Sequence, residues 1–296
     1  MVQSYTREST VKIDWFWSRD RTTWFEDRNC QYWIWASTTV KGGSIQAKYS
    51  NPWIPADALC ILHEAKGPIL DVGGGGAPYY GSAHIVDIQP FSGERLGSNA
   101  WGYPDDGNRQ AIQWSEKQYT QLDVCDCRRW PFDDRQYEIG LCSHCIEDVR
   151  DPSHAVRELS RVCSRVLIIA PSRLLEQTMG VEHPRYCGFH NHQWIISSDK
   201  DTIVFRRKSP IVNLRGCHIR CPYGMTLKRE YGAAFHLGTG FHARECAFWS
   251  EKDDFNDYRQ FILPYLGRQD IFESDGRTHD IRTMVWYLKR RFLSTL

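Results

Sequence analysis

The residues best suited to bind a ligand form a glycine-rich loop after a short apolar strand. The segment 69–72 (ILDV) runs directly into four glycines, Gly73 to Gly76. Because glycine has no Cβ, a strand that ends in such a loop lets the backbone approach a ligand closely and donate its N–H groups. The loop therefore predicts a ligand site at the end of this strand.

The spacing within the loop distinguishes two ligand classes. A dinucleotide site needs G-x-G-x-x-G/A, whose last position would here fall on a proline or a tyrosine. The spacing G-x-G-x-G/A fits at Gly73, Gly75 and Ala77, with Asp71 two residues before the first glycine. Asp87 comes 16 residues after Asp71, at the end of the next predicted strand, where a carboxylate can accept hydrogen bonds from ribose hydroxyls. This combination indicates a nucleoside-type cofactor.

The elements around the loop alternate between strands and helices. Periodicity predicts helices over 55–66 and 153–162, and strands over 69–72, 84–88, 119–124, 137–142 and 165–170. Short apolar strands that alternate with helices predict βαβ units and a buried parallel sheet. Farther along, we expect a hairpin over 193–208 and a last helix that begins near Asp280.

Six sequence blocks, in this order, resemble the class I S-adenosylmethionine-dependent methyltransferases, and more narrowly their type 11 group. The blocks are ILDVGGGGAP (69–78), HIVDIQ (84–89), LDVCDCRRWPFDD (122–134), YEIGLCSHCIEDVRDP (137–152), AVRELSRV (155–162) and RVLIIAPS (165–172). The resemblance covers about 55–172. It implies an α/β, Rossmann-like fold with a mostly parallel seven-stranded sheet and helices on both faces, and S-adenosyl-L-methionine as cofactor.

The resemblance also implies which residues bind the cofactor. This set is Asp71, Gly73, Gly75, Asp87, Asp126, Cys127 and Ser143. Within it, Gly73 and Gly75 would border the methionine part and Asp87 would bind the ribose. Asp126 would contact the adenine amino group, with the backbone N–H of Cys127 nearby.

The chain departs from the family pattern in two places. The link between the glycine loop and Asp87 is short, so the first helix of the family is expected to be truncated or replaced by a turn. Glu147-Asp148 stands where the family often has Glu-His, which removes any role for a histidine there. The segments 171–176 and 190–194 resemble a branch associated with glycan or surface-polysaccharide assembly.

Histidines are the candidate catalytic groups. Methylation of a hydroxyl needs a proton acceptor, and histidine suits that role at neutral pH. The resemblance places Ser143 and His144 beside the transferred methyl, and the predicted catalytic set is His144, His190 and His192. Structural histidines held by hydrogen bonds are the alternative. A less favoured alternative is a divalent metal bound by His190 and His192 together with Glu176, Glu182 or His183. The favoured interpretation includes no metal.

Three regions follow from these patterns. Residues 1–54 form an aromatic-rich N-terminal cap, residues 55–172 the S-adenosylmethionine-binding core, and residues 173–296 a substrate-side insertion that also completes the sheet. Five of the 12 tryptophans lie in the first 35 residues. Packing on the core is the favoured role for these rings, and a lid over the acceptor is the alternative.

Composition excludes several protein classes. The 296 residues carry a formal charge of only +1, which counts against a nucleic-acid binder. The sequence has no run of 18 apolar residues, so no membrane span is expected. The N-terminus has no apolar stretch, so no secretory signal is expected. The odd number of cysteines, 11, therefore indicates reduced thiols in the cytoplasm. A structural zinc on Cys125, Cys127, Cys142 and Cys145 is the less favoured interpretation.

The sequence thus predicts methyl transfer to an oxygen or nitrogen of a small molecule, which would be a sugar or glycan intermediate or a natural product. The first alternative is a non-catalytic binding or regulatory protein that keeps the S-adenosylmethionine site but transfers no methyl group. The second is a nucleic-acid methyltransferase, which the segment 142–145 (CSHC) disfavours because it lacks the Asn/Asp-Pro-Pro block of base-amino methylases. No membrane partner is expected. A homodimer is compatible with the sequence but not specified by it.

Overall fold

The protein is a mixed α/β structure built on one large sheet. The computed structural model describes residues 22–27, 30–35, 56–94, 96, 100–102, 113–183, 185–199, 202–222, 225–227, 232–238, 242–246, 251–269 and 271–274. Within these described ranges the central sheet has eight strands in the order β1-β2-β13-β7-β6-β3-β4-β5. They are β1 (Thr22–Asp27), β2 (Cys30–Trp35), β3 (Ile69–Val72), β4 (His84–Asp87), β5 (Tyr119–Gln121), β6 (Tyr137–Ser143), β7 (Cys163–Pro171) and β13 (Gly232–Leu237).

Strand direction divides this sheet into two parts. The strands β5, β4, β3, β6 and β7 run parallel to one another. The strand β13 runs antiparallel to β7, β2 antiparallel to β13, and β1 antiparallel to β2. The parallel part carries the candidate site, because the carboxyl ends of parallel strands meet at one edge.

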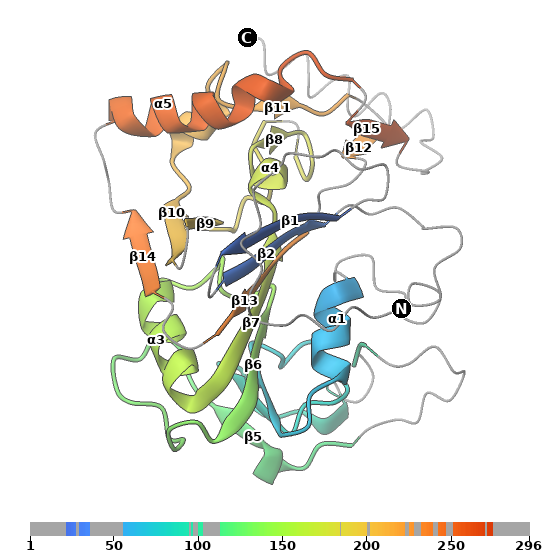
Figure 1. Cartoon of the computed structure of the whole chain (residues 1–296), viewed down its shortest axis with the longest axis vertical. Helices are drawn as coiled ribbons and strands as arrows, with labels where there is room; N and C mark the ends of the chain where they lie inside the picture. Colours follow the sequence, from blue (N-terminus) through green and yellow to red (C-terminus); the bar gives the residue numbers. More distant parts are fainter. Residues whose placement is uncertain are drawn as a thin grey trace.

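Helices cover both faces of the sheet. Figure 1 shows α1 (Ala56–His63) and α3 (Pro152–Val162) on opposite sides of it. Alternate residues of β6 pack toward opposite helices: Leu141 lies in the cluster that contains α1, and its neighbour Cys142 lies in the cluster that contains α3. Both faces are therefore buried, as expected of a parallel sheet.

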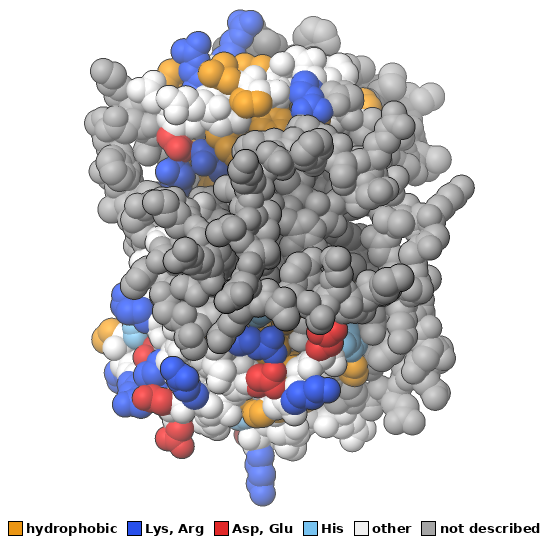
Figure 2. Space-filling view, in the orientation of Figure 1, with side chains coloured by type: hydrophobic (Ala, Val, Ile, Leu, Met, Phe, Trp, Pro, Cys, Tyr) orange, Lys and Arg blue, Asp and Glu red, His pale blue; other side chains and the backbone are white. Residues whose placement is uncertain are grey.

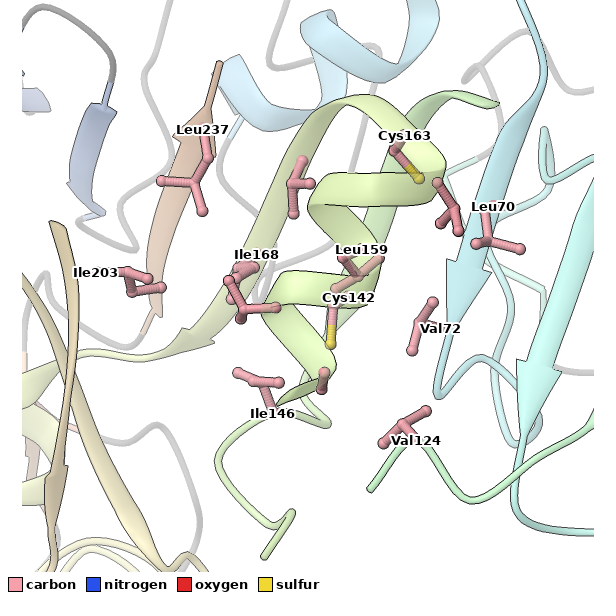
Figure 3. Packing of buried hydrophobic residues seen from close by; sticks show 14 of the residues in the cluster. Leu70, Val72, Val124, Cys142, Ile146, Leu159, Cys163, Ile168, Ile203 and Leu237 are labelled. Carbon is pink, nitrogen blue, oxygen red and sulfur yellow. The ribbon is translucent and has the colours of Figure 1, made fainter. Parts of the chain in front are cut away.

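The helix α3 shows how local sequence builds this core. Asp151 caps it by accepting a 2.8 Å hydrogen bond from the His154 N–H, and Pro152 occupies the first turn. Its apolar stripe includes Leu159, which is fully buried against the sheet (Figure 3). On the other side of the same cluster, Ile203 of β10 (Thr202–Arg207) extends the packing beyond the sheet.

The later part of the chain forms smaller units at one end of the central sheet (Figure 1). The hairpin β9–β10 pairs with β14, β8 pairs with β11, β12 pairs with β15, and α5 lies beside them. The remaining bounds are α4 (Arg173–Glu176), β8 (Thr178–Met179), β9 (Trp194–Asp199), β11 (Ile219–Arg220), β12 (Met225–Leu227), β14 (His242–Cys246), α5 (Glu251–Ile262) and β15 (Phe272–Ser274), with short 3-10 turns at Glu116–Gln118, Pro210–Asn213 and Leu263–Tyr265. No helix in the described ranges is long and apolar enough to cross a membrane.

Most predicted elements are confirmed, including the five parallel strands, both flanking helices and the hairpin over 193–208. The predicted count of seven strands differs from the eight observed, because the hairpin β1–β2 pairs with β13 and extends the sheet. The described part of the predicted cap is thus a sheet edge. The helix expected to begin near Asp280 lies outside the described residues. So do three aromatic residues of the predicted cap, Trp15, Phe16 and Trp17.

Charge of both signs occurs on the lower part of one face of the molecule (Figure 2). Figure 2 shows acidic and basic side chains interspersed over the lower part of the face in view. This distribution accords with the formal charge of +1.

We expect Leu159→Ala to lower the free energy of unfolding by about 2–5 kcal/mol, because it removes a fully buried side chain and leaves a cavity between α3 and the sheet. Urea unfolding followed by circular dichroism measures this. Arg157→Ala, at an exposed position of the same helix, is the control and should change stability by less than about 0.5 kcal/mol. Equal losses in the two variants would contradict the packing described.

Candidate cofactor and acceptor site

The sheet register brings the predicted cofactor residues to one edge. Val72 is paired with Val86 on one side and with Cys142 on the other. The next residue of each strand, Gly73, Asp87 and Ser143, therefore lies at the same carboxyl edge. This edge is where ligands bind in open parallel sheets.

Asp71 anchors the glycine loop from inside the protein. Its carboxylate is buried and accepts hydrogen bonds from the Tyr79 N–H at 2.7 Å and the Ser82 hydroxyl at 3.2 Å. Burial raises the pKa of Asp71 to about 7, although both hydrogen bonds oppose the rise. Asp71 thus holds the loop rather than presenting its carboxylate to a ligand.

The segment after the loop contains turns rather than a helix, which confirms the expected truncation. Trp101 fastens it: the indole donates to the Ala77 carbonyl at 2.7 Å, and backbone bonds join Trp101 to Pro78 and Tyr80. The Tyr79 ring, 1% exposed, packs at 5.2 Å from the Trp101 ring. Aromatic packing here takes the place of a helix in supporting the loop.

Three glycines of the loop, Gly73 to Gly75, have no room for a side chain, and for Gly73 and Gly75 the obstacle lies at the end of a neighbouring strand. A Cβ on Gly73 would lie 2.4 Å from the Cys145 sulfur, and Gly73 adopts φ +81°. A Cβ on Gly75 would lie 2.5 Å from the Asp87 carboxyl carbon, since the Gly75 N–H donates to Asp87 at 2.9 Å. The loop therefore packs directly on the ends of β6 and β4.

Asp87 keeps acceptor capacity for a ligand. One oxygen accepts from the Gly75 N–H and the other from the Gln89 N–H at 2.8 Å, and each carboxylate oxygen can accept a further bond. The next residue, Ile88, leaves an apolar side chain 62% exposed. Sequence reasoning missed Ile88, although an apolar residue directly after the acid was its signal. A carboxylate for a ribose beside an apolar surface for a base fits a nucleoside cofactor.

Asp126 and Cys127 lie in the turn after β5. Asp126 pairs with Arg128, whose Nε is 2.9 Å from Oδ2, and hydrogen bonds from Arg128 lower the pKa of Asp126 to about 2. Cys127 is exposed. Asp126 is therefore ionised and already partnered, so an adenine amino group would share its oxygens with Arg128.

Beside the glycine loop, β6 ends in a strained turn. Ser143 is its last residue, and His144 follows with φ +50°, which is unusual for a residue with a side chain. The His144 Nδ1 atom lies 3.6 Å from Oε1 of Glu147, whose side chain is only 2% exposed. In the sequence, the only signal at Glu147 is its departure from the family pattern.

A buried cluster of three ionisable side chains, His192, Glu176 and Lys208, lies in the segment after β7. His192 Nδ1 is 2.7 Å from Oε1 of Glu176, while the Lys208 ammonium is 2.5 Å from Oε2. Burial by itself would lower the pKa of His192, but Glu176, with Glu147 and Asp148 nearby, raises it above the usual value. The sequence could not reveal Lys208, because it lies 32 residues from Glu176 in the chain.

The insertion is joined to the turn after β6. The N–H groups of Gln193 and Trp194 donate to the Glu147 carbonyl at 2.8 and 3.2 Å. The Gln193 side chain donates to the Asp148 carbonyl at 2.7 Å. His192 therefore lies beside the turn that follows β6.

His190 does not join this cluster. It is 67% exposed and pairs with Glu182 at 2.8 Å, while His192 pairs with Glu176. The alternative of a divalent metal requires His190 and His192 to converge on one ion with an acidic side chain. No cluster of three metal-ligating side chains occurs within the described ranges.

The cysteines near the site are reduced thiols. Cys125, Cys127, Cys142 and Cys145 are all unbridged, and Cys142 is fully buried in β6. A hydrogen bond to Cys145 and burial hold the pKa of the Cys142 thiol well above its usual range. Cys142 is thus a buried core thiol of β6.

A comparison with known protein families finds a match to part of the chain. Residues 94–166 match the family described as the methyltransferase domain, a segment that contains β5, β6, α3 and the first part of β7. The search among curated proteins finds no match. The matched domain is that of S-adenosylmethionine-dependent methyltransferases, and S-adenosylmethionine is the cofactor it implies.

Solved structures resemble part of the chain. A methyltransferase of Mesorhizobium loti is 13% identical, with 42% of this chain and 56% of that chain covered and a TM-score of 0.28. A methyltransferase of Aquifex aeolicus is 14% identical, with 44% and 68% covered and a TM-score of 0.24. The YcgJ protein of Bacillus subtilis is 19% identical, with 40% and 52% covered and a TM-score of 0.27. The chain thus spans about half the length of several of these proteins.

We expect Asp71→Asn to reduce the pH dependence of stability. The folded protein holds the Asp71 proton up to about pH 7, whereas the unfolded chain releases it near 3.8, so stability falls as pH rises between these values. Between pH 5 and 8 the wild type should lose about 2–3 kcal/mol from this group. The asparagine carbonyl can accept the same two hydrogen bonds without this loss. Urea unfolding at both pH values tests this, and identical pH profiles would contradict it.

Proposed function

We propose that this chain transfers a methyl group from S-adenosylmethionine to an oxygen or nitrogen of a small molecule, a sugar or glycan intermediate or a natural product. The observation that carries the proposal is the shared edge of the sheet. The glycine loop and Asp87 lie at this edge, and the turn with His144 and Glu147 follows the neighbouring strand. A donor site and an acceptor site are thereby adjacent.

The cofactor side is formed by the loop and the end of β4. Gly73 and Gly75 provide a backbone surface without side chains, Asp87 accepts from the ribose, and Ile88 packs against the base. When bound, S-adenosylmethionine supplies an activated methyl group on its sulfur. The protein contributes alignment of the acceptor and removal of its proton.

The acceptor side is formed by His144 and His192. Glu176 engages Nδ1 of His192 and fixes the ring, which leaves Nε2 as the atom that takes a proton from the acceptor. The raised pKa of His192, held up by Glu176 against the effect of burial, makes it a stronger base. His144, 32% exposed at the end of β6, contacts the acceptor. His190 is left out of this assignment because it pairs with Glu182 on the surface.

We expect Asp87→Ala to weaken S-adenosylmethionine binding by about 10-fold or more, because it removes a charged hydrogen-bond acceptor worth about 1.5–3 kcal/mol. Isothermal titration calorimetry measures this affinity. Asp133→Ala, an exposed acid outside the site, is the matched control and should bind like the wild type. No heat of binding with the wild type would refute the cofactor site, and unchanged affinity in Asp87→Ala would refute the role of Asp87.

We expect His192→Asn to lower turnover by about 100-fold or more while leaving cofactor affinity unchanged, because it removes the proposed base and not the cofactor site. Formation of S-adenosylhomocysteine with a pool of hydroxyl and amine compounds, followed by mass spectrometry, gives the rate. The exposed His190→Asn is the control and should retain the rate. Cofactor binding without turnover in the wild type would instead favour the non-catalytic alternative.

A further inference from the structure

Glu147 has an unused carboxylate oxygen inside the protein. Its side chain is 2% exposed, and Oε2 has no hydrogen-bond partner among the described residues. The other oxygen, Oε1, faces His144 at 3.6 Å. Burial of a carboxylate oxygen without a donor is unfavourable, so such a group persists where a ligand completes it.

The neighbouring carboxylates are satisfied by the protein itself. Glu176 has His192 on one oxygen and Lys208 on the other. The oxygens of Asp148 accept from the Asn191 amide at 3.2 and 3.3 Å. Among these three carboxylates, the oxygen that lacks a hydrogen-bond donor within the described residues is therefore Oε2 of Glu147.

Charge indicates what kind of partner is missing. Glu147, Asp148 and Glu176 are three carboxylates, and the Lys208 ammonium is a cation paired with Glu176. The proposed base His192 adds a positive charge only while it holds a proton. Arg207, which precedes Lys208, binds the amide oxygen of Gln193 instead. Negative charge is left over whether or not His192 is protonated, so the complementary partner is a cation that donates a hydrogen bond.

The position of Glu147 connects this partner to the proposed acceptor. Cys145, two residues before Glu147, packs directly against Gly73 of the glycine loop. His144, in contact with Glu147, is partly open to solvent. We infer that the acceptor of the proposed methyl transfer carries a protonated amino group, which Glu147 binds through Oε2 beside His144. This inference depends on the proposed function, which it narrows to small molecules that bear an amine.

The stability of two variants tests whether Glu147 is kept for a ligand. Glu147→Gln preserves shape and removes the uncompensated charge, so the protein without acceptor should melt a few degrees higher than the wild type. Glu176→Gln, at a carboxylate with both oxygens paired, is the matched control and should melt lower. Differential scanning fluorimetry measures both. A fall in melting temperature for Glu147→Gln would overturn the inference, since Glu147 would then be structural.

Matched compounds test the amine. Glucosamine against glucose, and cyclohexylamine against cyclohexanol, are titrated into the protein saturated with S-adenosylhomocysteine. At least one amine should bind the wild type about 10-fold or more tightly than its neutral counterpart, and Glu147→Gln should lose this preference. Equal binding of amines and neutral compounds, or no binding of any amine, would count against the inference.

Cofactor affinity separates this inference from the proposed function. Glu147→Gln should bind S-adenosylmethionine as tightly as the wild type, since Glu147 makes no contact with the glycine loop or Asp87 that the structure records. Cofactor binding without amine preference would reject the inference alone. A wild type that does not bind the cofactor would reject the proposed function as well.

Discussion

The buried carboxyl group of Asp71 is the contact on which the site depends. Because no helix follows the glycine loop, the loop is held from beneath by the hydrogen bonds from Tyr79 and Ser82 to Asp71. The loop in turn packs on Cys145 and Asp87, the ends of the neighbouring strands. Burial makes the charged form of Asp71 unfavourable, which is why its pKa rises to about 7.

Carboxylates near this edge divide into two kinds by how their oxygens are satisfied. Asp71 and Glu176 are buried and bound by donors of the protein itself, so their contribution is to position the loop and His192. Asp87 and Glu147 each retain an oxygen able to accept from a ligand, one on the proposed cofactor side and one on the acceptor side. A carboxylate here thus either positions parts of the site or binds the ligand, and the hydrogen-bond donors around it decide which.

Sequence reasoning was most accurate where the signal is local. The strand Ile69–Val72 has the predicted bounds, and α3 differs by one residue at its start. It was less accurate for the histidines, because the spacing of His190 and His192 predicts a shared face but not their partners. In the structure Glu182 engages one ring and Glu176 the other, so only His192 reaches the cluster at the end of β6.

The sequence by itself determined the parallel part of the sheet, the glycine loop and the kind of cofactor, because apolar periodicity and the need for residues without a Cβ are expressed in contiguous residues. Tertiary structure decided the rest. The pairing of Ile34 with Ala233, which adds the N-terminal hairpin to the sheet, joins segments about 200 residues apart. The contacts of Glu176 with Lys208 and the unpaired oxygen of Glu147 likewise depend on which distant segments pack around a carboxylate, and burial of that kind leaves no local pattern in the chain.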